Sequence, residues 1–191
     1  MFYMDGNVDK YKLSSYMFDL PAERIAQYPA MPRDHSRLLV LDRSSGTIRD
    51  KYFYDLESFV QPGDALVLNE TRVIPARLLG YKATGGQVEI LLLAKNRQGW
   101  DALVRPGRRL KEGHKVYFAH DRPEHLEILG KTEVEGGRVV AFRNCLDEEA
   151  LIEEIGHIPL PPYINRPDET HDRINYQTVY ARKSGSAAAP T

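Results

Sequence analysis

The densest group of side chains that could do chemistry lies near the end of the chain, at residues 172–180. It holds a carboxylate, an arginine, two side-chain amides and two phenols. Asp172 and Tyr176 are four residues apart, so they share one face if the segment is helical. A carboxylate or a phenol can take or give a proton when it lies within hydrogen-bond reach of a substrate. The segment therefore predicts a site for a polar ligand, with a helix cap and two core tyrosines as the alternative.

A stiff segment precedes this group. Residues 156–166 contain three prolines, which fix φ and remove backbone donors. We expect an extended chain that holds Tyr163 and Arg166 in place at little entropic cost. The alternative is an exposed proline-rich ligand for the aromatic groove of a partner protein. Burial of Pro161 and Pro162 would exclude that alternative.

Polar side chains also follow a predicted buried strand, where they commonly face a ligand. The candidates are Asn69, Thr71, Arg72 and Arg77. The alternative is a loop in which Asn69 and Thr71 bond their own backbone. Further along, Gly185 and Ser186 lie in a predicted flexible loop of small residues, whose backbone N–H groups could cradle a phosphate or a carboxylate.

Cations gather around one predicted turn. They are Arg105, Arg108, Arg109 and Lys111. The formal net charge is only −1 and the pI about 6.6, so the chain lacks the uniformly basic character of proteins that coat nucleic acid. Any RNA contact must use a local patch, and this turn is the best candidate for a phosphate contact. The alternative is a solvated hairpin tip.

Several classes of protein are excluded by what the sequence lacks. The six histidines show neither the paired spacing nor the cysteine partners of a metal site, so we expect no metal. There is no Walker loop, dinucleotide-binding glycine fingerprint or nucleophile elbow. The longest apolar run, residues 90–94, is far shorter than the about 20 residues of a bilayer span, and no signal-peptide core is present. We therefore expect a cytoplasmic protein without a membrane partner.

The elements that must position these side chains begin after a polar stretch, residues 1–15, that predicts a frayed end. Residues 16–62 predict a short helix opened by Pro21, a hairpin and a second short helix. Residues 146–191 predict an acidic helix ending at Gly156 as its C′ residue, an irregular proline-rich stretch and a brief helix over the 172–180 group.

Between these parts, residues 63–145 show short apolar runs separated by turn residues, which predict a small antiparallel barrel or sandwich. Pro75 interrupts the second run and predicts an edge or a bulge there. Cys145 is predicted to be a small core residue. The runs are 65–68, 73–79, 88–93, 100–104, 115–118, 126–129 and 138–142.

Several sequence blocks keep an order and spacing typical of one enzyme family. They are residues 18–21, 25–27, 33–39, 62–64, 69–77, 86–93, 100–109, 158–166, 176–181 and 185–191. From about Tyr16 onward, the chain resembles the S-adenosylmethionine:tRNA ribosyltransferase-isomerases of the queuosine pathway. The proline block and the Tyr-Gln-Thr-Val-Tyr block are the most specific.

The resemblance implies an unusual reaction. S-adenosylmethionine is a substrate that donates its ribosyl group, and the acceptor is 7-aminomethyl-7-deazaguanine at the wobble position of a tRNA. The sulfonium acidifies the adjacent 5′ carbon, so that a base can start the rearrangement. Adenine and methionine leave, and epoxyqueuosine remains in the tRNA. The scheme requires no cofactor beyond this substrate and no metal.

The resemblance also assigns residues by their matching positions. Asp172 and Tyr176 are the candidates for the proton-abstracting base. The arginines are expected to hold phosphate or the methionine carboxylate, since a planar guanidinium pairs with either through two bonds. The substrate-binding candidates are Arg33, Ser36, Arg37, Asn69, Thr71, Arg72, Arg77, Tyr163, Arg166, Gln177, Thr178, Tyr180, Gly185 and Ser186.

The expected fold is α+β and β-rich: a partial α/β domain with an inserted, Greek-key-like antiparallel β-barrel. In the family the last block continues past Thr191, so we expect these 191 residues alone to be inactive and to expose an unpaired sheet edge. We expect a monomer in which Arg37 or Asn69 lies on the same side as Tyr176. The competing hypothesis is a noncatalytic RNA-binding module that uses only the barrel and the basic turn.

Overall fold

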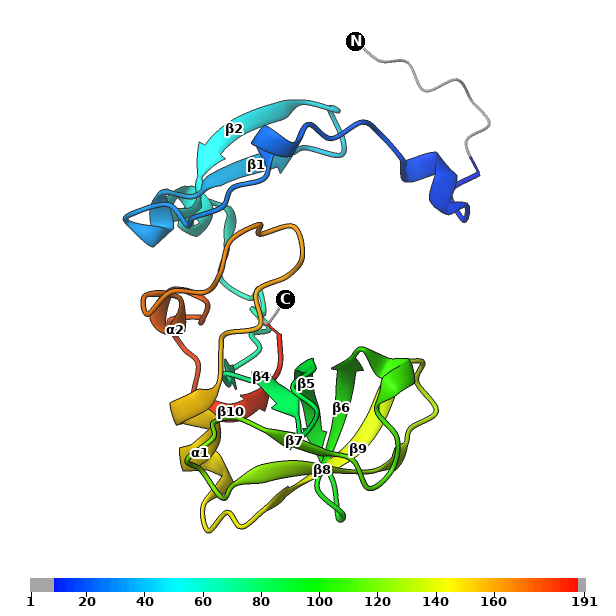
Figure 1. Cartoon of the computed structure of the whole chain (residues 1–191). Helices are drawn as coiled ribbons and strands as arrows, with labels where there is room; N and C mark the ends of the chain where they lie inside the picture. Colours follow the sequence, from blue (N-terminus) through cyan, green and yellow to red (C-terminus); the bar gives the residue numbers. More distant parts are fainter. Residues whose placement is uncertain (1–8, 189–191) are drawn as a thin grey trace.

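A closed barrel of six antiparallel strands dominates the computed structural model, which describes residues 9–188 (Figure 1). The strand order around the barrel is β4-β5-β6-β9-β8-β7, so β6 lies beside β9 in a Greek-key arrangement. The predicted antiparallel barrel is confirmed. Its strands are β4 (Arg77–Lys82), β5 (Gln87–Lys95), β6 (Trp100–Arg105), β7 (Lys115–Tyr117), β8 (His125–Lys131) and β9 (Gly137–Arg143).

Alternating side chains fill the barrel. Along β5, Val88, Ile90 and Leu92 are buried, whereas Glu89 and Leu91 face outward, as the period of two along a strand requires. The inward side chains of the other strands complete one apolar core. The fully buried ones include Leu78, Ile90, Leu92, Val116, Leu126, Ile128 and Val140.

The run at 73–79 is divided as Pro75 predicts. The short strand β3 (Thr71–Val73) ends before the proline and β4 begins after it. The strand β3 pairs in parallel with β10 (Lys183–Ser186), so the prediction of a flexible loop at Gly185 and Ser186 is wrong. The backbone of Ile74 extends this pairing, because its N–H donates to the Ser186 carbonyl at 3.0 Å.

The predicted strand at residues 65–68 is also wrong. The segment is not a strand, and within residues 9–188 no strand pairs with it, although its apolar side chains are exposed. Val67 is 93% exposed. Apolar residues alone do not make a strand when no neighbouring chain supplies ladder hydrogen bonds.

The acidic helix α1 (Glu148–Ile155) is confirmed, with Asp147 Oδ1 accepting from the Ala150 N–H at 3.0 Å. Leu151 and Ile152 pack against the barrel core. Gly156 follows the helix, but with φ −82° it lacks the left-handed conformation expected of a C′ glycine. The glycine is needed instead for a close approach, since a Cβ there would lie 2.0 Å from the carbonyl oxygen of Pro75.

The N-terminal part forms a hairpin of β1 (Arg37–Leu41) and β2 (Ile48–Tyr52), as predicted. The helix expected after Pro21 is only a 3-10 turn, because the chain becomes extended at Ile25 and one short turn cannot nucleate a longer helix. Most of the predicted frayed stretch, residues 1–8, lies outside the described residues. The 3-10 helices of this part are η1 (Leu13–Tyr16), η2 (Ala22–Arg24), η3 (Arg33–His35) and η4 (Phe53–Phe59).

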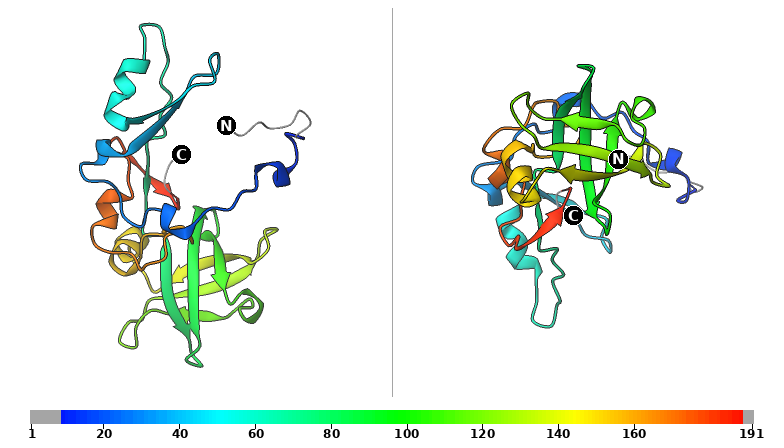
Figure 2. Two further views of the ribbon diagram at one scale, coloured as in Figure 1. Left: turned by 90° about the horizontal axis from the view of Figure 1, so that it is seen from above. Right: turned by 60° about the horizontal axis from the view of Figure 1, so that its bottom comes forward.

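The proline-rich segment and the short helix α2 (Asp172–Asn175) lie between the hairpin and the barrel (Figures 1 and 2). The brief helix predicted over residues 172–180 therefore forms, but only at its start. The unit formed by the barrel strands and α1 begins at Arg77 and ends just before His157, and the backbones of these two residues form an antiparallel bridge. Within the described residues no helix combines the length and the apolarity needed to cross a bilayer.

Candidate functional site

A groove of about 760 Å³ lies between the barrel and the proline-rich segment. One wall is the outer face of β4, β5 and β6, and the other is the chain from His157 to Asp168. Tyr176 lines the groove as well. Two elements far apart in the sequence thus enclose one site.

Strand register sets the chemistry of the barrel wall. Leu91 lies opposite Leu103, and Glu89 lies opposite Arg105, so an apolar row runs beside a charged row. Arg77 belongs to the charged row, since its Nε donates to Glu89 Oε1 at 2.8 Å. The predicted binding residue Arg77 therefore lies in the groove.

The proline-rich wall is held at both ends. His157 exchanges two backbone hydrogen bonds with Arg77, at 2.8 and 3.2 Å. Further along, the Gln27 side chain accepts from the Asn165 N–H at 2.6 Å and donates to the Tyr163 carbonyl at 3.1 Å. Within this wall Pro161 is half-buried and Pro162 is exposed, so burial does not exclude the peptide-ligand alternative.

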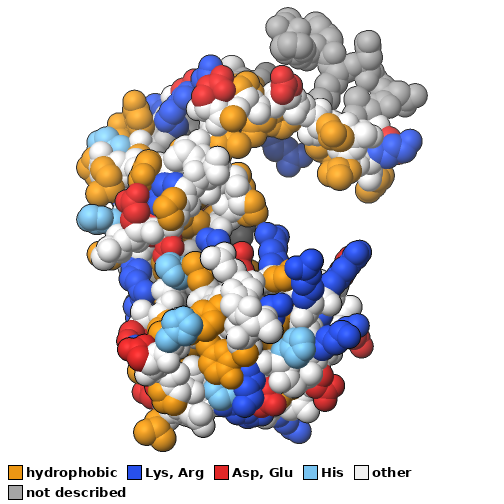
Figure 3. Space-filling view, viewed as in Figure 1, with side chains coloured by type: hydrophobic (Ala, Val, Ile, Leu, Met, Phe, Trp, Pro, Cys, Tyr) orange, Lys and Arg blue, Asp and Glu red, His pale blue; other side chains and the backbone are white. Residues whose placement is uncertain are grey.

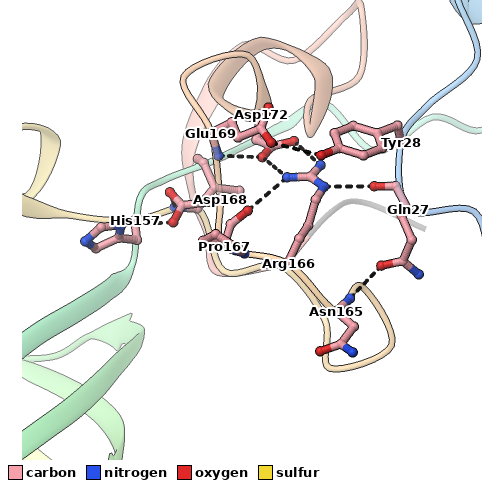
Figure 4. A network of polar contacts seen from close by, with 10 residues as sticks. Gln27, Tyr28, His157, Asn165, Arg166, Pro167, Asp168, Glu169 and Asp172 are labelled. Atoms are coloured by element: carbon pink, nitrogen blue, oxygen red, sulfur yellow. Dashed lines mark hydrogen bonds and ion pairs between the residues drawn. The ribbon is translucent and has the colours of Figure 1, made fainter.

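Arg166 and Asp172 form a buried ion pair next to the groove (Figure 4). Two parallel bonds of 2.7 and 2.8 Å join the guanidinium to the carboxylate, and Arg166 Nε donates to the Gln27 carbonyl at 2.9 Å. The Tyr28 ring lies 4.3 Å from the guanidinium carbon. The side chains of Arg166 and Asp172 are 11% and 6% exposed, so this pair is shielded from water.

The ion pair fixes the protonation of Asp172. Hydrogen bonds from Arg166 lower the pKa of Asp172, although burial acts in the opposite direction. The backbone N–H of Glu169 also donates to the carboxylate, at 2.8 Å. Because both oxygens are engaged and the group stays ionised, the geometry favours a positioning role for Asp172 over proton abstraction.

A second carboxylate orients a histidine at the groove. Asp168 Oδ1 lies 2.9 Å from Nδ1 of His157, and Asp168 Oδ2 accepts from the Ile158 N–H at 2.9 Å (Figure 4). From the sequence, His157 was considered only as one of six histidines without metal-site spacing, and Asp168, which lies eleven residues further along the chain, was missed. The contacts of Gln27 and Tyr28 with the proline-rich segment were also not predicted, although residues 25–27 form one of the family blocks.

Side chains from three distant parts of the sequence connect η3, the chain after α2 and β3. Arg33 donates to the backbone carbonyls of Asn175, at 3.3 Å, and of Gln177. The Gln177 side chain in turn accepts from the Val73 N–H at 2.8 Å and donates to the Val73 carbonyl at 2.7 Å. The amide of Gln177 thus bonds β3 as a neighbouring strand would.

Some of the predicted binding residues make other contacts instead. Arg37 forms an exposed ion pair with Asp50 at 3.2 Å, and Ser36 caps the preceding turn by donating to the Arg33 carbonyl at 2.9 Å. Asn69 accepts two bonds from Thr71, at 3.0 and 2.8 Å, which is the local arrangement that the loop alternative describes.

The other candidates have separate surroundings. Arg72 is exposed on β3, and Tyr163 is 62% exposed. Tyr180 lies at the surface, 37% exposed. Thr178 Oγ1 is buried, and within the described residues it has no hydrogen-bond partner. Gly185 and Ser186 belong to β10.

The basic turn lies at the rim of the barrel, where Figure 3 shows Lys and Arg side chains gathered above the strands. Arg108 and Arg109 are exposed in the short helix η5 (Gly107–Arg109). Arg138 is buried beneath the turn and donates to three carbonyls, among them that of Leu110 at 3.0 Å. Since no ion pair to Arg138 occurs within residues 9–188, its charge adds to the positive potential of the rim.

Arg105 connects the rim with the groove. It is the first cation of the basic turn and also lines the groove. Among the described residues, no group of three or more His, Cys, Asp or Glu side chains is arranged to hold a metal ion. The polar side chains that line the groove carry guanidinium, carboxylate, imidazole and phenol groups.

Comparison with known proteins agrees with the sequence blocks. The chain is 59% identical over 187 residues to the S-adenosylmethionine:tRNA ribosyltransferase-isomerase of Syntrophomonas wolfei, covering 98% of the chain and 53% of that relative. The enzyme of the same name from Symbiobacterium thermophilum is 49% identical over 182 residues, which cover 94% of the chain and 52% of that relative. The chain spans about half the length of these curated relatives.

A solved structure is also similar, namely that of the S-adenosylmethionine tRNA ribosyltransferase of Thermotoga maritima. The identity is 38% and the TM-score 0.37, over 77% of this chain and 50% of that one. A family model described as "Queuosine biosynthesis protein" matches residues 13–191. Because the match extends over nearly the whole sequence, the chain belongs to this family of queuosine biosynthesis proteins.

Proposed function

We propose that the complete gene product transfers the ribosyl group of S-adenosylmethionine to 7-aminomethyl-7-deazaguanine in tRNA. The products are epoxyqueuosine in the tRNA, adenine and methionine. The proposal is supported by the family membership and by the names of relatives that are 59% and 49% identical. In this proposal the protein acts as a monomer in the cytoplasm, with S-adenosylmethionine as substrate and without a metal.

The groove is the observation on which the assignment depends. Leu91 and Leu103 provide an apolar surface that suits the flat face of an adenine. Arg77 and Arg105 provide cations beside it, which suit a carboxylate or a phosphate. Tyr176 supplies a phenol in the same space. A nucleoside that carries an amino-acid chain needs this combination of surfaces.

A substitution that fills the groove tests the assignment. Leu91→Trp in the complete gene product is expected to slow adenine release from S-adenosylmethionine, in the presence of substrate tRNA, by at least about tenfold, or about 1.4 kcal/mol. The matched control is Leu93→Trp, because Leu93 lies on the same strand and faces outward, but does not line the groove. Equal rates for the two variants would show that the donor binds elsewhere.

We propose that the basic turn binds the tRNA backbone through Arg105, Arg108, Arg109 and Lys111. Because Arg105 also lines the groove, RNA bound at the rim would lie next to the donor site. A phosphate contact contributes an affinity that falls with salt concentration. Arg138 stabilises the turn from below, since it donates to the carbonyls of Gly107 and Leu110.

Removing two of the four cations of the basic turn tests this contact. Arg108→Ala with Arg109→Ala is expected to weaken tRNA binding and to lower the slope of log affinity against log salt by about 1 per cation. Arg97→Ala is the control, because Arg97 is an exposed cation on the turn between β5 and β6. A slope that changes equally in both proteins would contradict a specific role of the rim.

The same variants separate the transferase from the noncatalytic RNA module. A pure RNA module would lose only tRNA affinity at the rim, and the groove variant Leu91→Trp would have no chemical step to impair. Adenine release that depends on substrate tRNA excludes the module, and its absence from the complete gene product excludes the transferase.

A further inference from the structure

His157 is held at the groove in a geometry suited to proton transfer. Its side chain is 41% exposed, lines the groove and has Nδ1 2.9 Å from Asp168 Oδ1. A carboxylate that accepts from Nδ1 places the proton of a neutral imidazole on that nitrogen, and the lone pair of Nε2 is then the acceptor. Within residues 9–188 no hydrogen bond occupies Nε2.

Asp168 is itself well positioned. Its side chain is 14% exposed, and its second oxygen accepts from the Ile158 N–H at 2.9 Å. The backbone of His157 is fixed independently, through two hydrogen bonds with Arg77. The ring therefore has a defined place and orientation without using Nε2, as a catalytic imidazole requires.

We propose that His157 is the catalytic base at this groove and that Asp168 is its positioning residue. The inference rests on the proposed function and names the group that starts its chemistry. Asp172 is a weaker candidate, because both of its oxygens are bonded to Arg166. The other charged side chains of the groove are Arg77, Glu89, Arg105 and Arg166.

The proposed step moves one proton. The C–H bond at the 5′ carbon of S-adenosylmethionine breaks, and the proton binds to Nε2 of His157. The electron pair stays on carbon, where the adjacent sulfonium stabilises it. The imidazolium that forms lies against the Asp168 carboxylate, which stabilises its charge. No oxidant or reductant is involved.

The test is His157→Ala in the complete gene product, assayed for adenine release with saturating substrate tRNA. General-base catalysis contributes about 10²–10⁴-fold, so kcat is expected to fall by at least about 100-fold. Affinity for S-adenosylmethionine is expected to change less than about threefold. Added imidazole should restore at least about a tenth of the lost rate, which loss of a merely structural contact would not allow. His120→Ala, at an exposed histidine outside the groove, is the control.

Asp168→Asn adds a second measurement. Its kcat is expected to fall less than that of His157→Ala, because the base remains but loses its orientation, and imidazole should not restore it. An unchanged kcat in His157→Ala, with Leu91→Trp still impaired, would overturn the inference while leaving the proposed function intact. A fall in kcat that imidazole does not reverse would also overturn it. If the unmodified gene product releases no adenine, both the inference and the proposed function fail.

Discussion

Replacing Asp172 with asparagine is expected to lower the free energy of unfolding by about 3–5 kcal/mol, the usual cost of leaving one member of a buried ion pair without its partner. The Arg166 guanidinium would remain buried, without the carboxylate that accepts its two bonds of 2.7 and 2.8 Å. Urea unfolding followed by circular dichroism measures the change.

The matched control is Asp50→Asn, which breaks an ion pair with Arg37 whose side chains are 76% and 73% exposed. Such exposed pairs contribute about 0–1 kcal/mol, so this variant should be nearly as stable as the original protein. A similar loss in the two variants would mean that burial of the Arg166–Asp172 pair has no energetic importance.

Acid should remove the difference between the original protein and Asp172→Asn. The pKa of Asp172 is lowered in the folded protein, so its contribution is complete above the unfolded value of about 3.9. That contribution is lost as the pH falls through the lower, folded pKa. The two unfolding free energies should therefore differ most at neutral pH and converge below about pH 4.

Ile90→Ala is expected to destabilise the protein by about 2–5 kcal/mol, because it removes a fully buried side chain from the barrel core and leaves a cavity. Ile90 lies between Glu89 and Leu91, whose side chains face the groove. If the groove holds S-adenosylmethionine as proposed, a loosened β5 should also weaken that binding in the molecules that remain folded.

Unfolding in urea and calorimetric titration with S-adenosylmethionine measure these two effects. Val134→Ala is the control, since Val134 is 60% exposed and its truncation should cost less than about 0.5 kcal/mol. If Ile90→Ala lowered the free energy of unfolding no more than the control did, the side chain of Ile90 would not be part of a packed barrel core.

Local rules made the barrel predictable. The alternation of buried and outward residues along β5, the break at Pro75 and the cap at Asp147 each depend on neighbours within a few residues. The barrel, the hairpin and the acidic helix followed from such patterns.

Pairings between distant residues could not be predicted in the same way. Gln177 bonds Val73 across 104 residues, and Gln27 bonds Asn165 across 138. Nothing in the local period of either segment specifies such a partner. The parallel pairing of β3 with β10 was missed for the same reason, because parallel neighbours need a long crossover connection.

The candidate site was predictable in part. Resemblance of the sequence blocks singled out Arg77, Arg166 and Tyr176, which the structure places in or beside one groove. It could not tell that both oxygens of Asp172 are engaged or that Asp168 orients His157, since both facts depend on side-chain directions around an irregular bend.

The bridge between Arg77 and His157 brings the two ends of the segment that contains the barrel next to each other. Because these two ends are adjacent, the segment could be inserted into the surrounding domain, or deleted from it, without a change in the path of the remaining chain. A short glycine linker across the bridge would rejoin the surrounding domain after the segment is removed. The removed segment would include the helix α1, which packs against the barrel core.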